Sequence, residues 1–318
     1  MGLGDYIHYT AIIRDLYNFI NEPKNIDEKI KNINKIRKST SLNTIGIIKY
    51  MHKNNNMIPF KFYIKCSKKY KMEDMFYKNH KQCKRIFSNN PYITKNIKYQ
   101  NIIYIRIISN YYWSKKKENA NIFNVIDDTH IVDLYAKTLN LKNYSKYGEL
   151  YPSKIEIENV KKFLPSKKFI FISFEGKIKS RCFSLKKTNK LVIKLKELYP
   201  DFDIVQIIPT HFQKLDNVIT YDNFTFNETI FFAKHAEFCI VPHGGLSIGL
   251  SCFKVPTICL YSGLFNPKMT TYDSEIPLIF VDKNHLFCYN LNCNKCITDS
   301  ESYKLEHIMG KIEYLQKK

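Results

Sequence analysis

Two features that would direct a protein into or across a membrane are missing from this sequence of 318 residues. No apolar run approaches the roughly 18 uncharged residues that a membrane-spanning helix needs. The most apolar stretch, Phe238 to Phe265, is interrupted by His243, Lys254 and Pro256. The N-terminal MGLGDYIHYT also lacks the basic segment followed by an apolar one that marks a secretory signal. We therefore expect a cytoplasmic protein without a transmembrane segment.

A complete disulfide framework is excluded as well, because the nine cysteines are an odd number. Three of them, Cys239, Cys252 and Cys259, lie inside apolar runs. A reduced thiol serves there as a small hydrophobic side chain. The cysteine pattern therefore indicates a reducing compartment.

The spacing of Cys288, Cys293 and Cys296 is that of metal ligands, C-x4-C-x2-C. A tetrahedral zinc or iron site would need a fourth ligand such as His285 or Cys259. A reduced structural loop explains the same spacing without a metal. Both interpretations stay open at this point.

Acidic residues are few, since 29 Asp and Glu face 50 Lys and Arg for a net charge of +21. A nucleic-acid partner is one interpretation of such a charge. The lysines, however, are spread along the chain among many Asn, Ile and Tyr residues. Charge alone predicts nonspecific attraction to anionic surfaces. A basic cleft for a sugar nucleotide or an anionic acceptor uses the same charge, so nucleic acid is not the expected partner.

The length suits two α/β domains with separate cores, and we expect them to span residues 1–160 and 161–318. A polar, turn-rich stretch at 140–166 separates them. In the first domain, hydrophobic spacing predicts these elements: helices at 6–20, 71–87 and 130–139, with strands at 44–48, 60–66 and 102–108. We expect the last strand to be buried on both faces of a parallel sheet.

The second domain alternates regularly between strand and helix, which predicts βαβ crossovers and a parallel sheet. The expected strands are 168–174, 203–208, 218–221, 238–241 and 257–261, and the expected helices are 185–199, 227–235 and 246–253. A charged helix at 156–163 is expected within the polar stretch at 140–166. Ligands of open parallel sheets bind in the crevice beyond the carboxyl ends of the strands. The loops at 175–184, 209–213 and 242–247 are therefore the places to seek chemistry.

The loop from Pro242 to Ser247 joins a strand end to a helix start and contains Gly244 and Gly245. Adjacent glycines let the backbone approach a ligand, and free N–H groups at a helix start favour a diphosphate. His243 would bond to that phosphate or to a sugar. A tight turn capped by a histidine is the alternative interpretation of the same residues.

The loop at 175–184, which follows the expected strand 168–174, contains several basic residues. Of these, Lys179 and Arg181 are the candidates for neutralising a diphosphate. Each is also explained as a solvated charge. Asp5, directly after Gly4, is a candidate general base. A second role, which is compatible with the first, is that of N-cap residue of the first helix.

In the order of these features, the sequence resembles bacterial heptosyltransferases of glycosyltransferase family nine over nearly its whole length. The motifs that carry the resemblance are Gly4-Asp5 leading into a helix, the stretch from His130 to Ala136, Arg181-Cys182-Phe183 with Lys179 as the competing match, His243 to Ile248, Val255-Pro256, and Leu260 to Gly263.

The resemblance implies a GT-B fold, in which two Rossmann-like domains with parallel sheets face each other across a cleft. It implies inverting transfer from a nucleotide-diphosphate sugar with no required cofactor, Asp5 as base, and Arg181 or Lys179 on the donor diphosphate. The donor loop would comprise His243, Gly244, Gly245, Leu246 and Ser247. Phe224 and Thr225 would lie near the nucleotide base.

The sequence also departs from the family pattern. His243, Gly244 and Ile248 stand where the family loop has aspartate, threonine and histidine, so the usual heptose donor is not expected. The family's first strand has no counterpart here, because Met1 stands almost at Gly4. Either the true start lies upstream, or the first sheet is expected to be one strand short.

Two functions follow as hypotheses. The first is a glycosyltransferase acting on a hydroxyl of a glycan, lipid or protein acceptor. The second is a catalytically degenerate relative that binds glycan, nucleotide or nucleic acid, since a fold alone does not confer activity.

Overall fold

The chain forms two compact units, Met1–Tyr151 and Pro152–Lys318. The structure is a computed structural model, and it describes residues 3–23, 25–39, 45–51, 59–68, 71–74, 85–95, 101–108, 129–209, 212–280, 285, 288, 293–301 and 303–316. The limit between the units lies inside the polar stretch 140–166, ahead of the expected limit at 160/161. Helix α7 (Lys154–Lys161) therefore belongs to the second unit, where Asn159 Nδ2 donates to Glu228 Oε1 over 2.7 Å.

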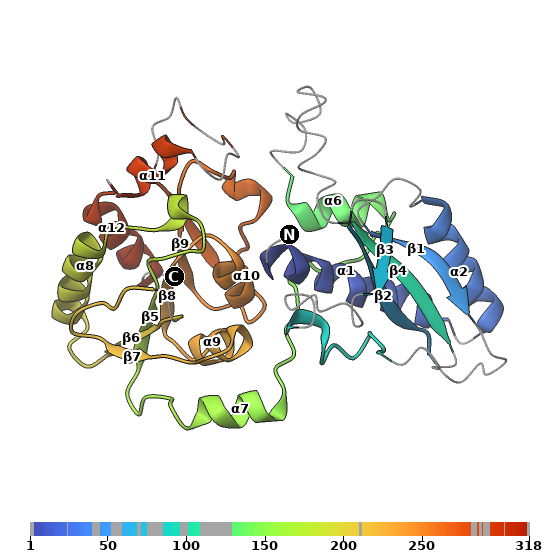
Figure 1. The fold of residues 1–318 in the computed structure, drawn as a ribbon, viewed down its shortest axis with the longest axis horizontal. Coiled ribbons are helices and arrows are strands. Elements are labelled where there is room, and N and C mark those ends of the chain that lie inside the picture. The colour runs from blue at the N-terminus through green and yellow to red at the C-terminus, as the bar shows by residue number, and fades with distance from the viewer. Residues whose placement is uncertain are drawn as a thin grey trace. The chain divides into compact units, whose positions relative to one another are not determined.

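The described part of the first unit contains the helices α1 (Leu3–Asn21), α2 (Ile26–Ser39) and α6 (Ile131–Thr138), a short helical segment at 85–87, and one four-stranded sheet. The strands are β1 (Ile45–Met51), β2 (Lys61–Lys68), β3 (Lys71–Asp74) and β4 (Ile102–Ile108). The strand order is β1-β4-β2-β3 (Figure 1). Residues 6–20 and 130–139 were predicted as helices, and both predictions are confirmed.

Helix α1 is the centre of this unit, because every residue from Ile7 to Ile13 is buried. The ring of Tyr9 stacks on that of Tyr135 from α6, with centroids 4.9 Å apart. Most of this stretch is apolar, as a helix buried on all sides requires, and the buried Thr10 hydroxyl donates to the Ile7 carbonyl over 2.7 Å. The helix begins at Leu3, so Asp5 lies in its first turn and is not the N-cap residue.

Two expectations for the first unit are wrong. Residues 71–74 form strand β3 instead of the start of a helix, because they pair antiparallel with residues 65–68 of β2. The sheet is mixed instead of parallel, since β2 and β4 are parallel but β1 and β4 are antiparallel. The first error concerns two strands that are neighbours in the sequence, whereas the second concerns β1 and β4, which lie far apart in it. Strand propensity depends on such pairings as well as on the local sequence. Residues 85–87, at the end of the expected helix, are helical, and residues 75–84 lie outside the described residues.

The second unit carries a six-stranded sheet in which every pairing is parallel. Its strands are β5 (Phe169–Ile172), β6 (Asp203–Ile207), β7 (Ile219–Tyr221), β8 (Phe238–Pro242), β9 (Thr257–Tyr261) and β10 (Glu275–Ile279). Its other elements are α7, the 3-10 helices η2 (Lys179–Arg181) and η3 (Pro267–Met269), and the helices α8 (Leu185–Leu198), α9 (Phe226–Ala233), α10 (Gly245–Ser251), α11 (Asn294–Glu301) and α12 (Leu305–Gln316). The predicted alternation is confirmed, with β10, α11 and α12 added at its end.

The inner strands β5, β8 and β9 are buried on both faces, as the continuous apolar runs predicted, whereas the edge strands β7 and β10 are partly exposed. Ile170 and Ile172 of β5 pack into a cluster with α8 and α12, whereas Phe169 and Phe171 pack into a second cluster with α9 and α10. Successive side chains of a strand point to opposite faces, so the sheet has helices on both sides (Figure 1). Among the described residues, no helix is both long and apolar enough to cross a membrane.

Candidate functional site

The strand order β10-β9-β8-β5-β6-β7 contains one point at which the chain reverses its direction across the sheet. The chain moves outward from β5 through β6 to β7, returns to the centre at β8, and then moves outward the other way (Figure 1). The loops after β5 and β8 therefore diverge from neighbouring strand ends. Such a switch point is where open α/β sheets bind ligands.

The loop after β5 folds back on itself and carries Arg181 in η2. A Cβ atom on Gly176 would come within 2.8 Å of the Arg181 Cβ, so only glycine fits at this close approach. The Cys182 thiol closes the same loop by donating to the Gly176 carbonyl over 3.2 Å. The loop is thus tightly built around the base of the Arg181 side chain.

Arg181 reaches from its own loop to the loop after β8. A Cβ atom on Gly244 would lie 3.1 Å from Arg181 Nη1, which is a tight contact. Gly244 itself is in extended backbone, with φ at 162°. The glycine is therefore explained by the space that the guanidinium occupies and not by backbone strain.

Phe265, from the segment after β9, packs against both loops. The guanidinium carbon of Arg181 lies 4.9 Å from the centroid of the Phe265 ring. The His243 ring meets the same phenyl ring edge-on, with centroids 5.6 Å apart. Arg181, His243 and Phe265 thus form one cluster at the switch point.

His243 is buried and already has partners on two sides. Its ring stacks on that of Tyr261 with centroids 4.3 Å apart, and its Nε2 lies 3.0 Å from Thr270 Oγ1. The proposed bond from His243 to a phosphate or sugar stays a prediction. The structure gives this side chain a role in holding the donor loop against β9.

Lys179, the competing match, lies in η2 as well but is exposed, whereas Arg181 is half-buried. The two candidates therefore differ in placement. Of the two side chains, only that of Arg181 lies against Gly244 and over the Phe265 ring.

The remaining donor-loop residues lie at the start of α10, as the sequence predicted. Gly245 and Leu246 are half-buried, and Ser247 is fully buried. Ser247 Oγ accepts from the Gly244 N–H over 3.2 Å and donates to the Gly244 carbonyl over 3.1 Å. Ser247 therefore fixes the turn from within.

Glu275 is a buried carboxyl group beneath this turn, at the start of β10. Burial raises its pKa to about 8, while hydrogen bonds from the Tyr272 N–H and from Ser247 act in the opposite direction. Burial also raises the pKa of Cys259, and the nearby Glu275 adds to this shift. Burial beneath the turn therefore favours the uncharged form of both groups.

The predicted base-binding residues lie at the start of α9. Thr225 is the N-cap residue, and its side chain accepts from the Glu228 N–H while Glu228 Oε2 accepts from the Thr225 N–H. The Phe224 ring is parallel to that of Tyr221 at 6.0 Å and meets Phe232 edge-on. Their contact with a nucleotide base stays a prediction.

A further hydrogen bond joins the loop after β5 to the loop after β6. Glu175 Oε2 accepts from the Gln213 N–H over 2.6 Å. The loops at 175–184 and 209–213, which the sequence singled out, are therefore tied together at their described residues. Asp5 belongs to the other unit, and its side chain lies outside the described residues.

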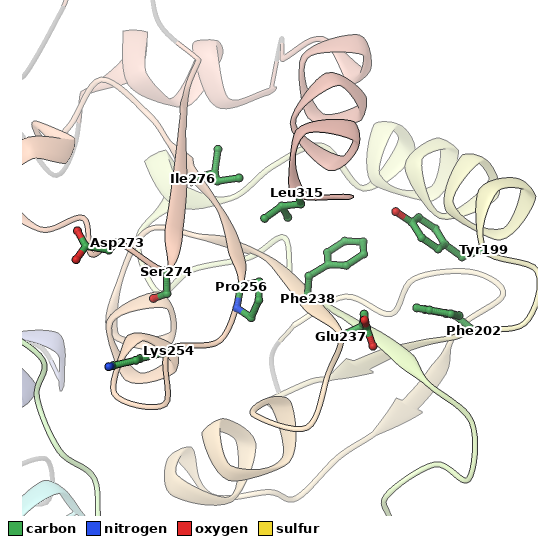
Figure 2. Close-up of a pocket in the computed structure, with 10 residues that line it drawn as sticks. All are labelled: Tyr199, Phe202, Glu237, Phe238, Lys254, Pro256, Asp273, Ser274, Ile276 and Leu315. Atoms are coloured by element: carbon green, nitrogen blue, oxygen red, sulfur yellow. The ribbon is translucent and has the colours of Figure 1, made fainter. Parts of the chain in front are cut away.

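A pocket of about 660 Å³ lies at the opposite edge of the sheet (Figure 2). It is lined by residues that precede strands, such as Phe202 before β6, Lys254 before β9 and Ser274 before β10. Ligands of parallel sheets bind beyond the carboxyl ends of the strands. This pocket is therefore separate from the loops at the switch point.

The cysteines with metal-like spacing do come together. One nitrogen or sulfur atom from each of His285, Cys288, Cys293 and Cys296 lies within 4.8 Å of every other. His285 is thus the fourth member of the cluster. The alternative, Cys259, is buried in β9.

Sequence reasoning missed Phe265 and Glu275. Phe265 follows the carboxyl end of β9, so the rule that located the other loops would have found it. Glu275 starts β10, which was not predicted, because Pro277 argues against a strand except at a sheet edge.

The sequence matches no protein-family model and no curated protein. Solved structures are similar to it at low identity. A family 9 glycosyltransferase from Veillonella parvula aligns with a TM-score of 0.45 at 11% identity, over 60% of each chain. The iron-containing heptosyltransferase TibC of enterotoxigenic Escherichia coli, solved with ADP-D-beta-D-heptose, gives 0.43 at 12% identity, over 60% of this chain and 55% of TibC.

The ADP-heptose LPS heptosyltransferase II of E. coli gives a TM-score of 0.41 at 10% identity, over 59% of this chain and 63% of that protein. This chain therefore matches less than two thirds of the length of each of these proteins. At such low similarity, their activities do not transfer to it.

Proposed function

We propose that the chain is a glycosyltransferase whose second unit binds a nucleotide-diphosphate sugar at the switch point between β5 and β8. The observation that carries this proposal is the position of Arg181. Its guanidinium lies against Gly244, and both residues come from loops that follow the two strands at the switch point. The sequence motifs that resemble family nine fall on these same two loops.

The chemistry of the cluster suits a diphosphate. A guanidinium offers paired N–H donors whose geometry matches phosphate oxygens. It is held by Phe265 and by the tightly folded loop around Gly176, so little reorganisation is needed when charge develops. Phe224 and Thr225 would lie near the nucleotide base in this proposal.

The transfer itself is proposed to invert the anomeric centre. Asp5 would accept the proton of an acceptor hydroxyl, whose oxygen attacks the anomeric carbon as the bond to the diphosphate breaks. Arg181 would stabilise the negative charge on the departing diphosphate, so no catalytic metal is included. The acceptor would be a hydroxyl of a glycan, a lipid or a protein.

Nucleotide affinity tests the donor site. Isothermal titration calorimetry with ADP, GDP, UDP and CDP should find one that binds, and Arg181→Ala should weaken that binding about 10- to 100-fold, as expected for charge-assisted hydrogen bonds. Lys179→Ala is the matched control, because it removes a cation from the same 3-10 helix. Equal affinity in wild type and Arg181→Ala would overturn the site.

Donor turnover tests the reaction. Wild-type protein should hydrolyse or transfer from one member of a panel of nucleotide sugars, and Asp5→Ala should be slower by about 100-fold or more. Equal turnover would remove Asp5 from the mechanism. If nucleotides bind without any turnover, or if only nucleic acid raises the melting temperature, the catalytically degenerate binding protein is the correct alternative.

A further inference from the structure

His285, Cys288, Cys293 and Cys296 form a closed set of metal-ligand side chains outside the candidate donor site. His285 Nε2 lies 3.0 Å from Cys293 Sγ, and Cys288 Sγ lies 3.4 Å from Cys296 Sγ. In a tetrahedral zinc site with ordinary bond lengths, the ligand atoms are about 3.5–3.8 Å apart. The four atoms are thus close to the required positions.

The chemistry of the four side chains favours zinc. One imidazole and three thiols are a known ligand set for structural Zn²⁺, and soft sulfur ligands disfavour magnesium and calcium. The pairing of Cys288 with Cys296 as a disulfide is a poorer explanation, since their sulfur atoms are well beyond the 2.03–2.05 Å of a disulfide bond. Both are free thiols in the structure.

The cluster is connected to the segments that build the donor site. The Cys288 N–H donates to the Gly263 carbonyl over 3.0 Å, two residues before Phe265. Helix α11, which carries Cys296, packs against η2, which carries Arg181. Ser300 of α11 also donates its hydroxyl to the Cys182 carbonyl over 2.9 Å.

We propose that these four residues bind one Zn²⁺ ion, which joins the Phe265 segment to the Arg181 loop and holds both in place. The four side chains are buried or half-buried, and one ligand atom of each already lies within 4.8 Å of the others. With the ion bound, two segments far apart in the sequence share one fixed anchor. The effect on diphosphate binding rests on the proposed function, whereas metal binding and loop ordering do not.

Metal content is the first test. Protein expressed in medium supplemented with both zinc and iron, and measured by inductively coupled plasma mass spectrometry, should contain about one zinc per chain. The Cys288→Ser and His285→Ala variants, at half-buried positions, should lose it, and Cys252→Ser should retain it as the matched control. No bound metal in the wild type would overturn the site, and iron at the same stoichiometry would overturn its assignment to zinc.

Hydrogen–deuterium exchange is the second test. Loss of zinc in Cys288→Ser should speed exchange at least several-fold in residues 176–184 and 260–266, while residues 203–207 of β6 stay unchanged. Unchanged exchange in both loops would overturn their anchoring by the ion. If Cys288→Ser does not fold, removal of the ion from wild-type protein by a chelator provides the same comparison.

Discussion

The guanidinium of Arg181 lies over the ring of Phe265, 4.9 Å from its centroid. This contact joins the loop after β5 to the segment after β9, across the strand between them. An aromatic face attracts a cation by about 0.5–1 kcal/mol at partly exposed sites. It also fixes the plane of the guanidinium, and that plane decides which N–H groups are available to a ligand.

Replacing Phe265 by leucine should therefore weaken nucleotide binding without unfolding the unit. Leucine keeps apolar contact but removes the π face, so we expect about a 2- to 5-fold loss of affinity. Calorimetric titration measures it. Phe231→Leu is the control, because Phe231 also lies under a cation, Lys234 at 3.8 Å, but on α9. A loss of affinity in both variants would argue against a specific role of Phe265.

Substitution of Gly244 by alanine should act through Arg181. The new Cβ would lie 3.1 Å from Arg181 Nη1 and displace the guanidinium, whereas the extended backbone at Gly244 tolerates any residue. We expect weaker nucleotide binding with a melting temperature within a few degrees of wild type. In an Arg181→Ala background the same substitution should have no further effect on binding. An additive loss would show that Gly244 contacts the ligand directly.

Gly249→Ala should destabilise the second unit. Its Cβ would come within 2.2 Å of Ile230 Cδ1, and Ile230 is fully buried, so α10 and α9 would be pushed apart. Overpacking of this kind costs about 1–3 kcal/mol of unfolding free energy. Adding Ile230→Val removes the clashing methyl group and should restore part of the loss. Denaturant unfolding measures both variants, and no recovery in the double variant would contradict this geometry.

Glu275 predicts a pH dependence of stability. Burial raises its pKa in the folded protein from 4.5 to about 8, so between these values the unfolded chain is ionised while the folded chain keeps the proton. Its stabilising contribution is therefore complete below about pH 4.5 and is lost as the pH rises toward 8. The loss is at most about 1.4 kcal/mol per pH unit.

Glu275→Gln should flatten this dependence, because glutamine keeps an acceptor for the Tyr272 N–H and does not ionise. The measurement is denaturant unfolding from pH 5 to pH 8.5. Asp273→Asn removes an exposed carboxylate two residues away and should leave the slope as in wild type. If the unfolding free energy of Glu275→Gln changed with pH as steeply as that of the wild type, the pH dependence would belong to other groups.

The sequence predicted the second sheet well because its strands are short, continuous apolar runs between helices, and this pattern is local. Helix α2 was missed although Ile26, Ile30, Ile33 and Ile36 have helical spacing, since lysines and asparagines surround them. Strand β3 was mistaken for helix although it pairs with β2, the strand directly before it, whereas the antiparallel partners β1 and β4 lie far apart in the sequence. Local propensity does not report such a pairing.

The candidate site was likewise predictable only in part. The loops that carry Arg181 and His243 could be located from the sequence, because ligands of parallel sheets bind beyond the carboxyl ends of the strands. The choice between Lys179 and Arg181 required the packing of Gly176 and Gly244, which no pattern in the sequence encodes. The choice of His285 over Cys259 likewise required the position of β9, which buries Cys259 in the sheet.

The central position of β5 has a consequence for how the chain is made. Its neighbour β8 begins only at Phe238, so β5 has one unpaired edge while the ribosome synthesises the 65 residues between them. Apolar strands with open edges invite pairing with other chains. We expect chains that end before Phe238 to be prone to aggregation, whereas chains released from the ribosome after Tyr261 contain the strands that close the middle of the sheet.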